Sequence, residues 1–260
     1  MTVDWNRFTR LYDDDYGDYV ADLEFYLPFA ERTGGPILEA MCGTGRIILP
    51  LAQAGFDVVG VDISETMVER ARAKLKTAGV ESRGRAEVGD VRSLQLTEQF
   101  ALALVPMNSF MHLSTGTEQR AALKAMHAHL QPQGLLILDL FNPDPQEISA
   151  DQDVLVHAKS FRSSAGYEVQ KWILRRSDFA AQTHYVEFVY DEIGPDRIVR
   201  RDVLPFTMRW LYRFELEYLL VGTGYVVEAL YGSYELDDYS SDGQRLIAVA
   251  RRSDGAIDGA

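Results

Sequence analysis

The chain has 260 residues, enough for one large hydrophobic core, and an ordinary balance of 47% hydrophobic and 25% charged residues. Its single cysteine, Cys42, excludes an internal disulfide and a cysteine-based metal cluster. The formal net charge of −13 disfavours nucleic acid as a partner, because phosphate backbones attract proteins through Lys and Arg.

Targeting and membrane segments are not expected. The first 19 residues carry acids early and have no apolar core, so they do not resemble a signal peptide. No run approaches the ~18 apolar residues that a membrane span needs. With one cysteine, this composition predicts a cytoplasmic protein without a membrane partner.

The first 150 residues read as a helical segment followed by alternating strands and helices. Residues 1–35 are expected to form a helical N-terminal cap. Apolar runs then predict strands at 37–41, 57–61, 86–88, 100–106 and 135–141. Helices are predicted between them at 47–54, 64–78 and 117–130, with Pro132 and Gly134 ending the last one. Strands that are apolar on both faces and separated by helices predict a doubly wound α/β fold with a parallel sheet.

The pattern changes between residues 150 and 210. Polar residues alternate with apolar or aromatic ones at 154–161, 167–176, 183–190 and 198–206, which predicts an inserted antiparallel sheet or lid. A helix at 213–221 and strands at 225–231 and 245–250 are expected to follow. We therefore expect one domain with a cap (1–35), a core (36–149), an insert (150–210), a final helix and hairpin (211–252) and a frayed tail (253–260).

The strongest local motif runs from Glu39 to Arg46 and reads EAMCGTGR. It follows a predicted strand and opens a helix, where glycines let a ligand approach the backbone and free N–H groups bind polar atoms. A dinucleotide fingerprint, G-x-G-x-x-G, fits poorly. Started at Met41 it lacks two of its three glycines, and started at Gly43 it places Ile48 at the third position.

This motif resembles the first motif of the class I S-adenosylmethionine-dependent methyltransferases, an acid followed by G-x-G-x-G. Here the acid is Glu39, and the glycine positions hold Met41, Gly43 and Gly45. The similarity covers roughly residues 36–145 and returns in the final helix and hairpin. It implies a Rossmann-like seven-stranded sheet, with the antiparallel insert between strand five and the last helix that small-molecule N- and O-methyltransferases carry.

The resemblance also assigns residues to the adenosyl part of the cofactor. Asp62, at the end of the second strand, would accept hydrogen bonds from the ribose, although an acid there can also cap the next helix. Asp90 would accept from the adenine amine, and the backbone N–H of Val91 would meet the ring. Ile63 or Met67 would pack on the adenine face, although Met67 is equally suited to the core.

The methionyl part is assigned in the same way. Glu39 would bind the region of the methionine amine, and Tyr12 lies in an N-terminal stretch that often covers the cofactor in similar enzymes. Backbone groups of the first turn and of the segment after the fourth strand would complete the site: Gly43, Thr44, Gly45, Met107 and Asn108.

Candidate catalytic residues follow from the chemistry of methyl transfer. A neutral leaving group requires no metal, but an ammonium or hydroxyl acceptor must lose a proton. His112 follows the fourth strand and is the first candidate base, with a local backbone contact as the alternative. Tyr19 is a second candidate, although the N-terminal tyrosines can equally anchor that segment. The three acids at 13–15 are expected to be solvated.

The sequence thus predicts methylation of a small molecule, with nitrogen preferred over oxygen because the acidic balance and the insert suit an amine-bearing acceptor. The protein is expected to be a monomer or a homodimer. A non-catalytic sensor of S-adenosylmethionine or S-adenosylhomocysteine is the alternative from another class. A nicotinamide oxidoreductase is less favoured, because the dinucleotide fingerprint lacks glycines. An RNA methyltransferase is less favoured, because the net charge is −13.

Overall fold

The structure is a computed structural model that describes residues 5–150 and 152–253. The start of the expected cap, residue 151 and the expected tail from 254 onward lie outside the described residues. The chain divides into two compact units, each described here by itself. The first combines the N-terminal segment up to Tyr19 with Pro143–Trp210, and the second combines Val20–Asn142 with the chain from Leu211 onward.

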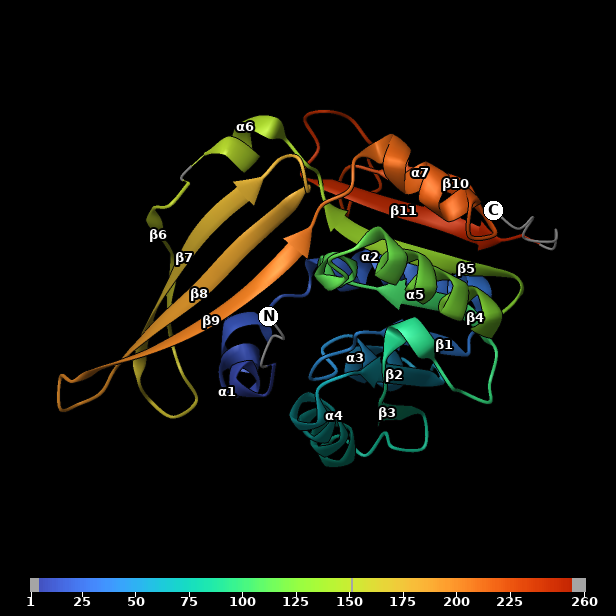
Figure 1. The fold of residues 1–260 in the computed structure, drawn as a ribbon. Helices are drawn as coiled ribbons and strands as arrows, with labels where there is room; N and C mark the ends of the chain where they lie inside the picture. Colours follow the sequence, from blue (N-terminus) through green and yellow to red (C-terminus); the bar gives the residue numbers. More distant parts are fainter. Residues whose placement is uncertain (1–4, 151, 254–260) are drawn as a thin grey trace. The chain divides into compact units, whose positions relative to one another are not determined.

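The second unit is built on a seven-stranded sheet with the strand order β10-β11-β5-β4-β1-β2-β3 (Figure 1). Five of its strands are parallel, and β11 runs antiparallel to β5. The strands are β1 (Ile37–Ala40), β2 (Val58–Asp62), β3 (Gly84–Val88), β4 (Phe100–Val105), β5 (Leu130–Phe141), β10 (Tyr225–Tyr231) and β11 (Arg245–Arg252).

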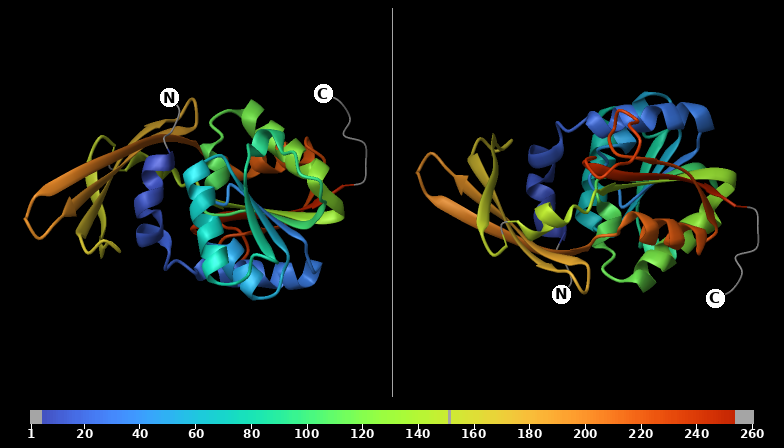
Figure 2. Two further views of the ribbon diagram at one scale, coloured as in Figure 1. Left: turned by 90° about the horizontal axis from the view of Figure 1, so that it is seen from below. Right: turned by 90° about the horizontal axis from the view of Figure 1, so that it is seen from above.

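Helices cover both faces of this sheet. One face packs against α2 (Ala21–Thr33), α3 (Ile48–Gln53) and α4 (Glu65–Thr77), which share a single hydrophobic core with the strands. On the opposite side lie α5 (Gly116–His129) and α7 (Arg213–Val221), as Figure 2 shows. Two short 3-10 helices, η1 (Val91–Ser93) and η2 (Ser109–His112), follow β3 and β4. The predicted doubly wound fold is therefore confirmed.

The strand order creates a topological switch point between β1 and β4. From β1 the chain moves outward through β2 and β3, and it then returns to place β4 and β5 on the other side of β1. Because these five strands are parallel, their carboxyl ends meet at one edge, where open α/β sheets bind ligands. The fold thus brings the loops after β1, β2, β3 and β4 together.

Local signals set most helix boundaries. Ser64 caps α4 by accepting a hydrogen bond from the Met67 N–H at 3.3 Å, and Thr115 forms a capping box with Glu118. One boundary was predicted wrongly: the strand expected to begin at 135 begins at Leu130, directly after α5, so Pro132 and Gly134 lie inside β5. Pairing with β4 extends the strand there, and a register shift absorbs the irregularity.

The first unit contains an antiparallel sheet with the order β6-β7-β8-β9. This confirms the predicted insert between strand five and the last helix. Its strands are β6 (Leu155–Arg162), β7 (Glu168–Asp178), β8 (Thr183–Ile193) and β9 (Val199–Arg209), and its helices are α1 (Trp5–Tyr16) and α6 (Pro145–Ser149).

Helix α1 is anchored on this sheet by a buried ion pair. Asp15 is 1% exposed and Lys171 4%, and the Lys171 Nζ lies 2.6 Å from an Asp15 carboxylate oxygen. The Tyr190 hydroxyl donates to the same Asp15 oxygen, and the Tyr16 hydroxyl accepts from Lys171. Breaking such a pair leaves a charge without compensation, which costs about 3–5 kcal/mol. The expectation that Asp15 is solvated was therefore wrong, because its partner lies far away in the chain.

Close packing of the first turn against β2 depends on Gly60. A Cβ atom at this position would lie 2.1 Å from the Ile48 side chain and 2.8 Å from the Cys42 sulfur. We expect Gly60→Ala to lower the free energy of unfolding by about 1–3 kcal/mol, because a packed core does not accept an added methyl without strain. Chemical denaturation measures this change.

Gly116→Ala is the matched control for this substitution. Gly116 begins α5, and nothing lies within 4 Å of the position its Cβ would take. The control should be neutral or slightly stabilising, because alanine has the higher helix propensity. Equal effects of the two substitutions would contradict the packing argument.

Candidate active site

The turn after β1 lies in a left-handed conformation along most of its length. Met41 has φ 60°, Gly43 has φ 54° and Gly45 has φ 76°. This region costs a residue with a side chain about 1–2 kcal/mol, whereas glycine adopts it freely. Met41 therefore occupies a position that suits glycine, which explains why the sequence motif fits there despite the substitution.

Asp62 ties this turn to the end of β2. One carboxylate oxygen accepts from the Gly43 N–H at 2.8 Å, and the other accepts from the Ser64 N–H at 2.9 Å. Burial raises the pKa of Asp62, and these backbone hydrogen bonds act against the rise. Because Ser64 caps α4, Asp62 is not the helix cap, and each of its oxygens keeps a second lone pair for a ligand.

Asp90 follows β3 at the same edge of the sheet. The Gly89 N–H donates to the backbone oxygen of Asp62 at 2.9 Å, so the two acidic segments adjoin. Asp90 pairs with Arg92 at 2.6 Å, and hydrogen bonding from Arg92 is the main cause that lowers its pKa. Arg92 also contacts Glu118. The sequence analysis missed Arg92, although it stands only two residues after the acid.

The residues beside these acids differ in exposure. Met67 and Val91 are buried at 4% and 6%, whereas Ile63 is 55% exposed. Of the two candidates for the adenine face, Ile63 thus has the more accessible side chain. The Thr44 hydroxyl accepts from the Lys74 ammonium at 3.0 Å, which holds the glycine turn against α4.

Glu39 is a buried acid in the middle of the sheet. Its side chain is almost fully buried, and its Oε2 atom has no hydrogen-bond partner within the described part of the chain. Burial raises the pKa of Glu39 to about 8, although the nearby Arg46 lowers it. Arg46 makes two hydrogen bonds to the fully buried Asp22, at 2.5 and 2.7 Å, so its charge is largely engaged there.

The segment after β4 forms a second strained turn. Met107 and Asn108 both have positive φ, 49° and 62°. Asp139 of β5 holds them, because its carboxylate accepts from the Met107 N–H at 3.0 Å and its backbone oxygen accepts from the Asn108 N–H at 2.8 Å. The Asp139 carboxylate also accepts hydrogen bonds from Tyr26, Tyr234 and Arg245. The sequence analysis missed Asp139, whose only signal is an acid inside the apolar run at 135–141.

The candidate catalytic residues lie in different units. His112 ends η2 and is half-buried, in the same unit as Glu39. Tyr19 and Tyr12 belong to the unit that contains α1, where the Tyr12 ring packs 5.3 Å from the rings of Phe8 and Tyr16. The roles of His112, Tyr19 and Tyr12 stay predictions.

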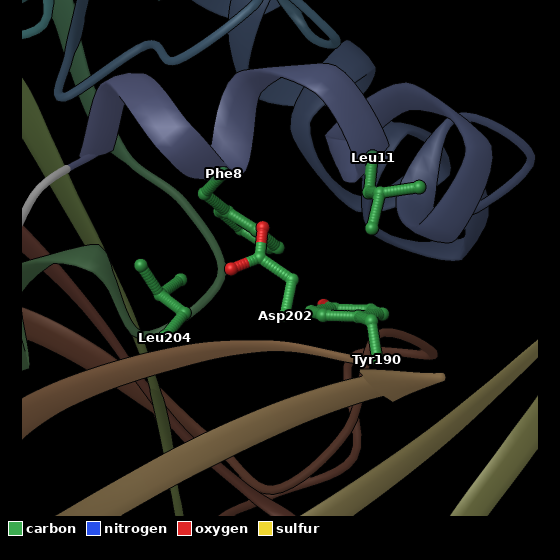
Figure 3. A pocket seen from close by; sticks show the side chains of 5 residues that line it. All are labelled: Phe8, Leu11, Tyr190, Asp202 and Leu204. Carbon is green, nitrogen blue, oxygen red and sulfur yellow. The ribbon is translucent and has the colours of Figure 1, made fainter. Parts of the chain in front are cut away.

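The α1 unit also contains a small crevice between α1 and the sheet (Figure 3). It is lined by Phe8, Leu11, Tyr190, Asp202 and Leu204, and its cavity volume is about 10 Å³. Pockets for small molecules typically measure about 300–1,000 Å³, so this crevice alone does not accommodate an adenosyl ligand.

Comparison with known proteins finds a methyltransferase domain in the chain. Residues 37–134 match a family described as a methyltransferase domain. The cypemycin N-terminal methyltransferase of a Streptomyces species is 25% identical over 234 residues, covering 90% of this chain and 88% of that protein. The dTDP-3-amino-3,4,6-trideoxy-alpha-D-glucopyranose N,N-dimethyltransferase of Streptomyces venezuelae is 26% identical over 125 residues, covering 48% and 50%. RNA methyltransferases also match, over less than a third of their own length.

A solved structure agrees with this result at the level of the fold. A S-adenosylmethionine-dependent methyltransferase from Clostridium acetobutylicum superposes with a TM-score of 0.79 at 16% identity, covering 96% of this chain and 99% of that one. The chain is an S-adenosylmethionine-dependent methyltransferase with the fold of the class I enzymes. Its methyl donor is therefore S-adenosylmethionine.

The residues at the sheet edge of this methyltransferase fit that cofactor. The unsatisfied carboxylate oxygen of Glu39 suits an ammonium group, because a buried polar atom without a partner is unfavourable. The turn at 41–45 contains two glycines, whose missing side chains let a ligand approach the backbone, and Asp62 keeps acceptor capacity for hydroxyl groups. Among the residues described, no group of three or more His, Cys, Asp or Glu side chains is arranged to hold a metal ion. No helix in the described ranges is both long and apolar enough to cross a membrane.

The raised pKa of Glu39 gives the methyltransferase a testable linkage between pH and ligand binding. Below pH 8 the free Glu39 carboxyl is mainly protonated, and an ammonium ligand favours its ionised form. Binding of S-adenosylhomocysteine, which keeps the amino acid ammonium, should therefore release up to about one proton at pH 7, and affinity should rise toward pH 8. Calorimetry in buffers of different ionisation enthalpy measures this release.

Glu39→Gln is the control, and it should abolish the proton release. Because burial raises the pKa of Glu39 in the folded protein, the unfolded chain ionises first, and the stability of the free protein falls as pH rises from 4.5, the ordinary pKa, to about 8. The variant should therefore be at least as stable as the parent at pH 8. Proton release that is unchanged in Glu39→Gln would contradict this role.

Proposed function

We propose that this methyltransferase transfers a methyl group from S-adenosylmethionine to an amine nitrogen of a small molecule. The observation that carries the cofactor site is the buried Glu39 oxygen without a partner among the described residues, next to a left-handed turn that contains two glycines. The choice of acceptor is supported by the two relatives, a cypemycin N-terminal methyltransferase and an N,N-dimethyltransferase of a dTDP-amino sugar. A net charge of −13 also suits a cationic or neutral acceptor better than RNA.

In this proposal the cofactor extends along the sheet edge. Asp62 accepts hydrogen bonds from the ribose, and Asp90 with the Val91 N–H binds the adenine. Ile63 or Met67 packs on the adenine face. Glu39 binds the amino group of the methionyl part. Five further residues contribute backbone groups near it: Gly43, Thr44, Gly45, Met107 and Asn108. Tyr12 is proposed to cover the cofactor.

When bound, S-adenosylmethionine supplies an activated methyl group, whose S–C bond breaks with its electron pair going to sulfur as the bond to the acceptor forms. The protein must align the acceptor lone pair with that bond and exclude water. His112 is proposed to remove a proton from the acceptor, and Tyr19 to help position it. We further propose a cytoplasmic enzyme, monomeric or homodimeric, without nucleic-acid or membrane partners.

The ribose role of Asp62 can be tested by binding alone. Asp62→Ala should weaken S-adenosylhomocysteine binding by about 1–3 kcal/mol, because hydrogen bonds to a charged acceptor are lost. Asp57→Ala is the matched control: Asp57 precedes the same strand at its opposite end and is exposed. If calorimetry shows equal affinity for Asp62→Ala and the parent protein, Asp62 does not bind the ribose.

The acceptor class and the base are tested by turnover. Formation of S-adenosylhomocysteine is measured with glycine, a free-N-terminal peptide, a dTDP-amino sugar and a catechol. We expect turnover with an amine and not with the catechol. His112→Ala should then lower kcat about 10²–10⁴-fold with little change in cofactor affinity. Parent-like kcat of His112→Ala across pH would remove His112 from the role of base.

A further inference from the structure

Arg92 holds the Asp90 carboxylate through both its backbone and its side chain. The Arg92 backbone N–H donates to Asp90 Oδ1 at 2.9 Å. In the guanidinium group, Nη2 donates to Oδ2 at 2.6 Å, and Nε lies 2.9 and 3.0 Å from Oδ1 and Oδ2. Charge-assisted, two-pronged contacts of this kind are strong and fix the geometry of both groups. The direction of the Asp90 carboxylate is therefore set by a residue two positions further along the chain.

Glu118 fixes Arg92 from the other side. The Arg92 Nη1 atom lies 2.5 Å from Glu118 Oε1. The second oxygen of Glu118, Oε2, accepts from the Thr115 N–H and hydroxyl at 3.1 and 3.0 Å, within the capping box of α5. A chain of contacts thus runs from the start of α5 through Glu118 and Arg92 to Asp90. All of these residues belong to the second unit.

This network contributes little to the stability of the fold. The side chains of Asp90, Arg92 and Glu118 are 29%, 38% and 28% exposed. Ion pairs at such positions contribute about 0–1 kcal/mol, because solvent screens the attraction and the side chains lose conformational freedom. A network that adds little stability and yet fixes one carboxylate at the proposed adenine site points to a role in binding.

The contacts also limit what else Asp90 can bind. A carboxylate offers about four acceptor sites on its two oxygens. Three N–H groups of Arg92 occupy most of them: the backbone N–H, Nε and Nη2. Hydrogen bonding from Arg92 also lowers the pKa of Asp90, so the carboxylate stays ionised at neutral pH and only accepts. Asp90 therefore keeps about one acceptor site, in a direction that Arg92 determines.

We propose that Arg92 is a positioning residue for recognition of the adenine base, and that Glu118 keeps Arg92 in place. This inference rests on the proposed function, in which Asp90 accepts a hydrogen bond from the adenine amine. A carboxylate that is already fixed loses no further freedom when the base binds, so the hydrogen bond contributes more to affinity. It also does not turn away from a base that presents a carbonyl at the same position. The network therefore selects a 6-aminopurine over a 6-oxopurine.

The test compares two ligands that differ only at this position of the base. S-adenosylhomocysteine carries the amine, and S-inosylhomocysteine carries a carbonyl in its place. Calorimetry gives both dissociation constants, and their ratio measures the selectivity for the amine. We expect the parent protein to bind S-adenosylhomocysteine about a hundredfold or more tightly, because the carbonyl donates no hydrogen bond to the charged acceptor.

Three variants test the network. Arg92→Gln should lower the ratio about tenfold, because the released carboxylate binds the amine less well and can turn away from the carbonyl. Glu118→Gln should lower it as well, but should have no further effect in the Arg92→Gln protein, because it acts through Arg92. Arg92→Lys keeps the charge but loses the planar fork, so it should also lower the ratio. It replaces Arg92→Gln if that variant does not fold.

Arg85→Gln is the matched control. Arg85 lies near the end of β3 that is remote from Asp90. Like Arg92, it is partly exposed and pairs with two acids, Glu87 and Glu98, at 2.7 and 2.8 Å. The substitution removes the same charge without changing the contacts of Asp90, so the ratio should stay within about twofold of the parent value.

The outcomes separate this inference from the proposed function. An unchanged ratio in a folded Arg92→Gln protein overturns the role of Arg92, even if the affinity for both ligands falls together. A rise in the affinity for S-adenosylhomocysteine overturns it too, because Arg92 would then compete with the base. If the parent protein binds neither ligand, or if Asp90→Ala keeps the parent ratio, the proposed cofactor site itself is wrong.

Discussion

The hydrogen bond from the Gly43 N–H to the Asp62 carboxylate is the constraint on which the candidate site depends. It joins the turn after β1 to the end of β2, two segments that are 19 residues apart in the sequence. The turn approaches β2 this closely only because Gly60 has no side chain. With the turn fixed, the ends of β1, β2 and β3 present their polar groups at one edge of the sheet.

Locally unfavourable features gather at that edge. Met41 and Asn108 have left-handed backbones, Glu39 is an acid buried with an unsatisfied oxygen, and Asn108 has a second buried acceptor without a partner. Each feature lowers stability by itself, and the surrounding sheet core supplies the stability that tolerates them. Proteins that follow local rules elsewhere depart from them mainly at functional sites, so this clustering supports the assignment independently of the sequence motif.

The sequence predicted the elements well where the signal is local. Apolar runs located β1, β2, β4 and β5, and the alternating pattern located the antiparallel sheet, because strand periodicity is visible in a few consecutive residues. Contacts between distant residues were not predictable. Asp139 and Tyr26 are 113 residues apart, and Lys171 and Asp15 are 156 residues apart, so nothing near either acid indicates its partner. The start of β5 at Leu130 was missed for the same reason, because pairing with β4 decides where this strand begins and Pro132 does not.

The balance of charge at the site explains why a cationic ligand suits it. Glu39, Asp62 and Asp90 lie at the ends of three neighbouring strands. The two arginines nearby compensate this set only in part, because Arg46 pairs with Asp22, and Arg92 pairs with both Asp90 and Glu118. Burial makes the remaining negative charge costly, as the raised pKa values of Glu39 and Asp62 show. A ligand with an ammonium and a sulfonium group relieves that cost at the ends of the strands. The sulfur is neutral after methyl transfer, and we therefore expect the same acidic edge to bind the spent cofactor less strongly than the methyl donor.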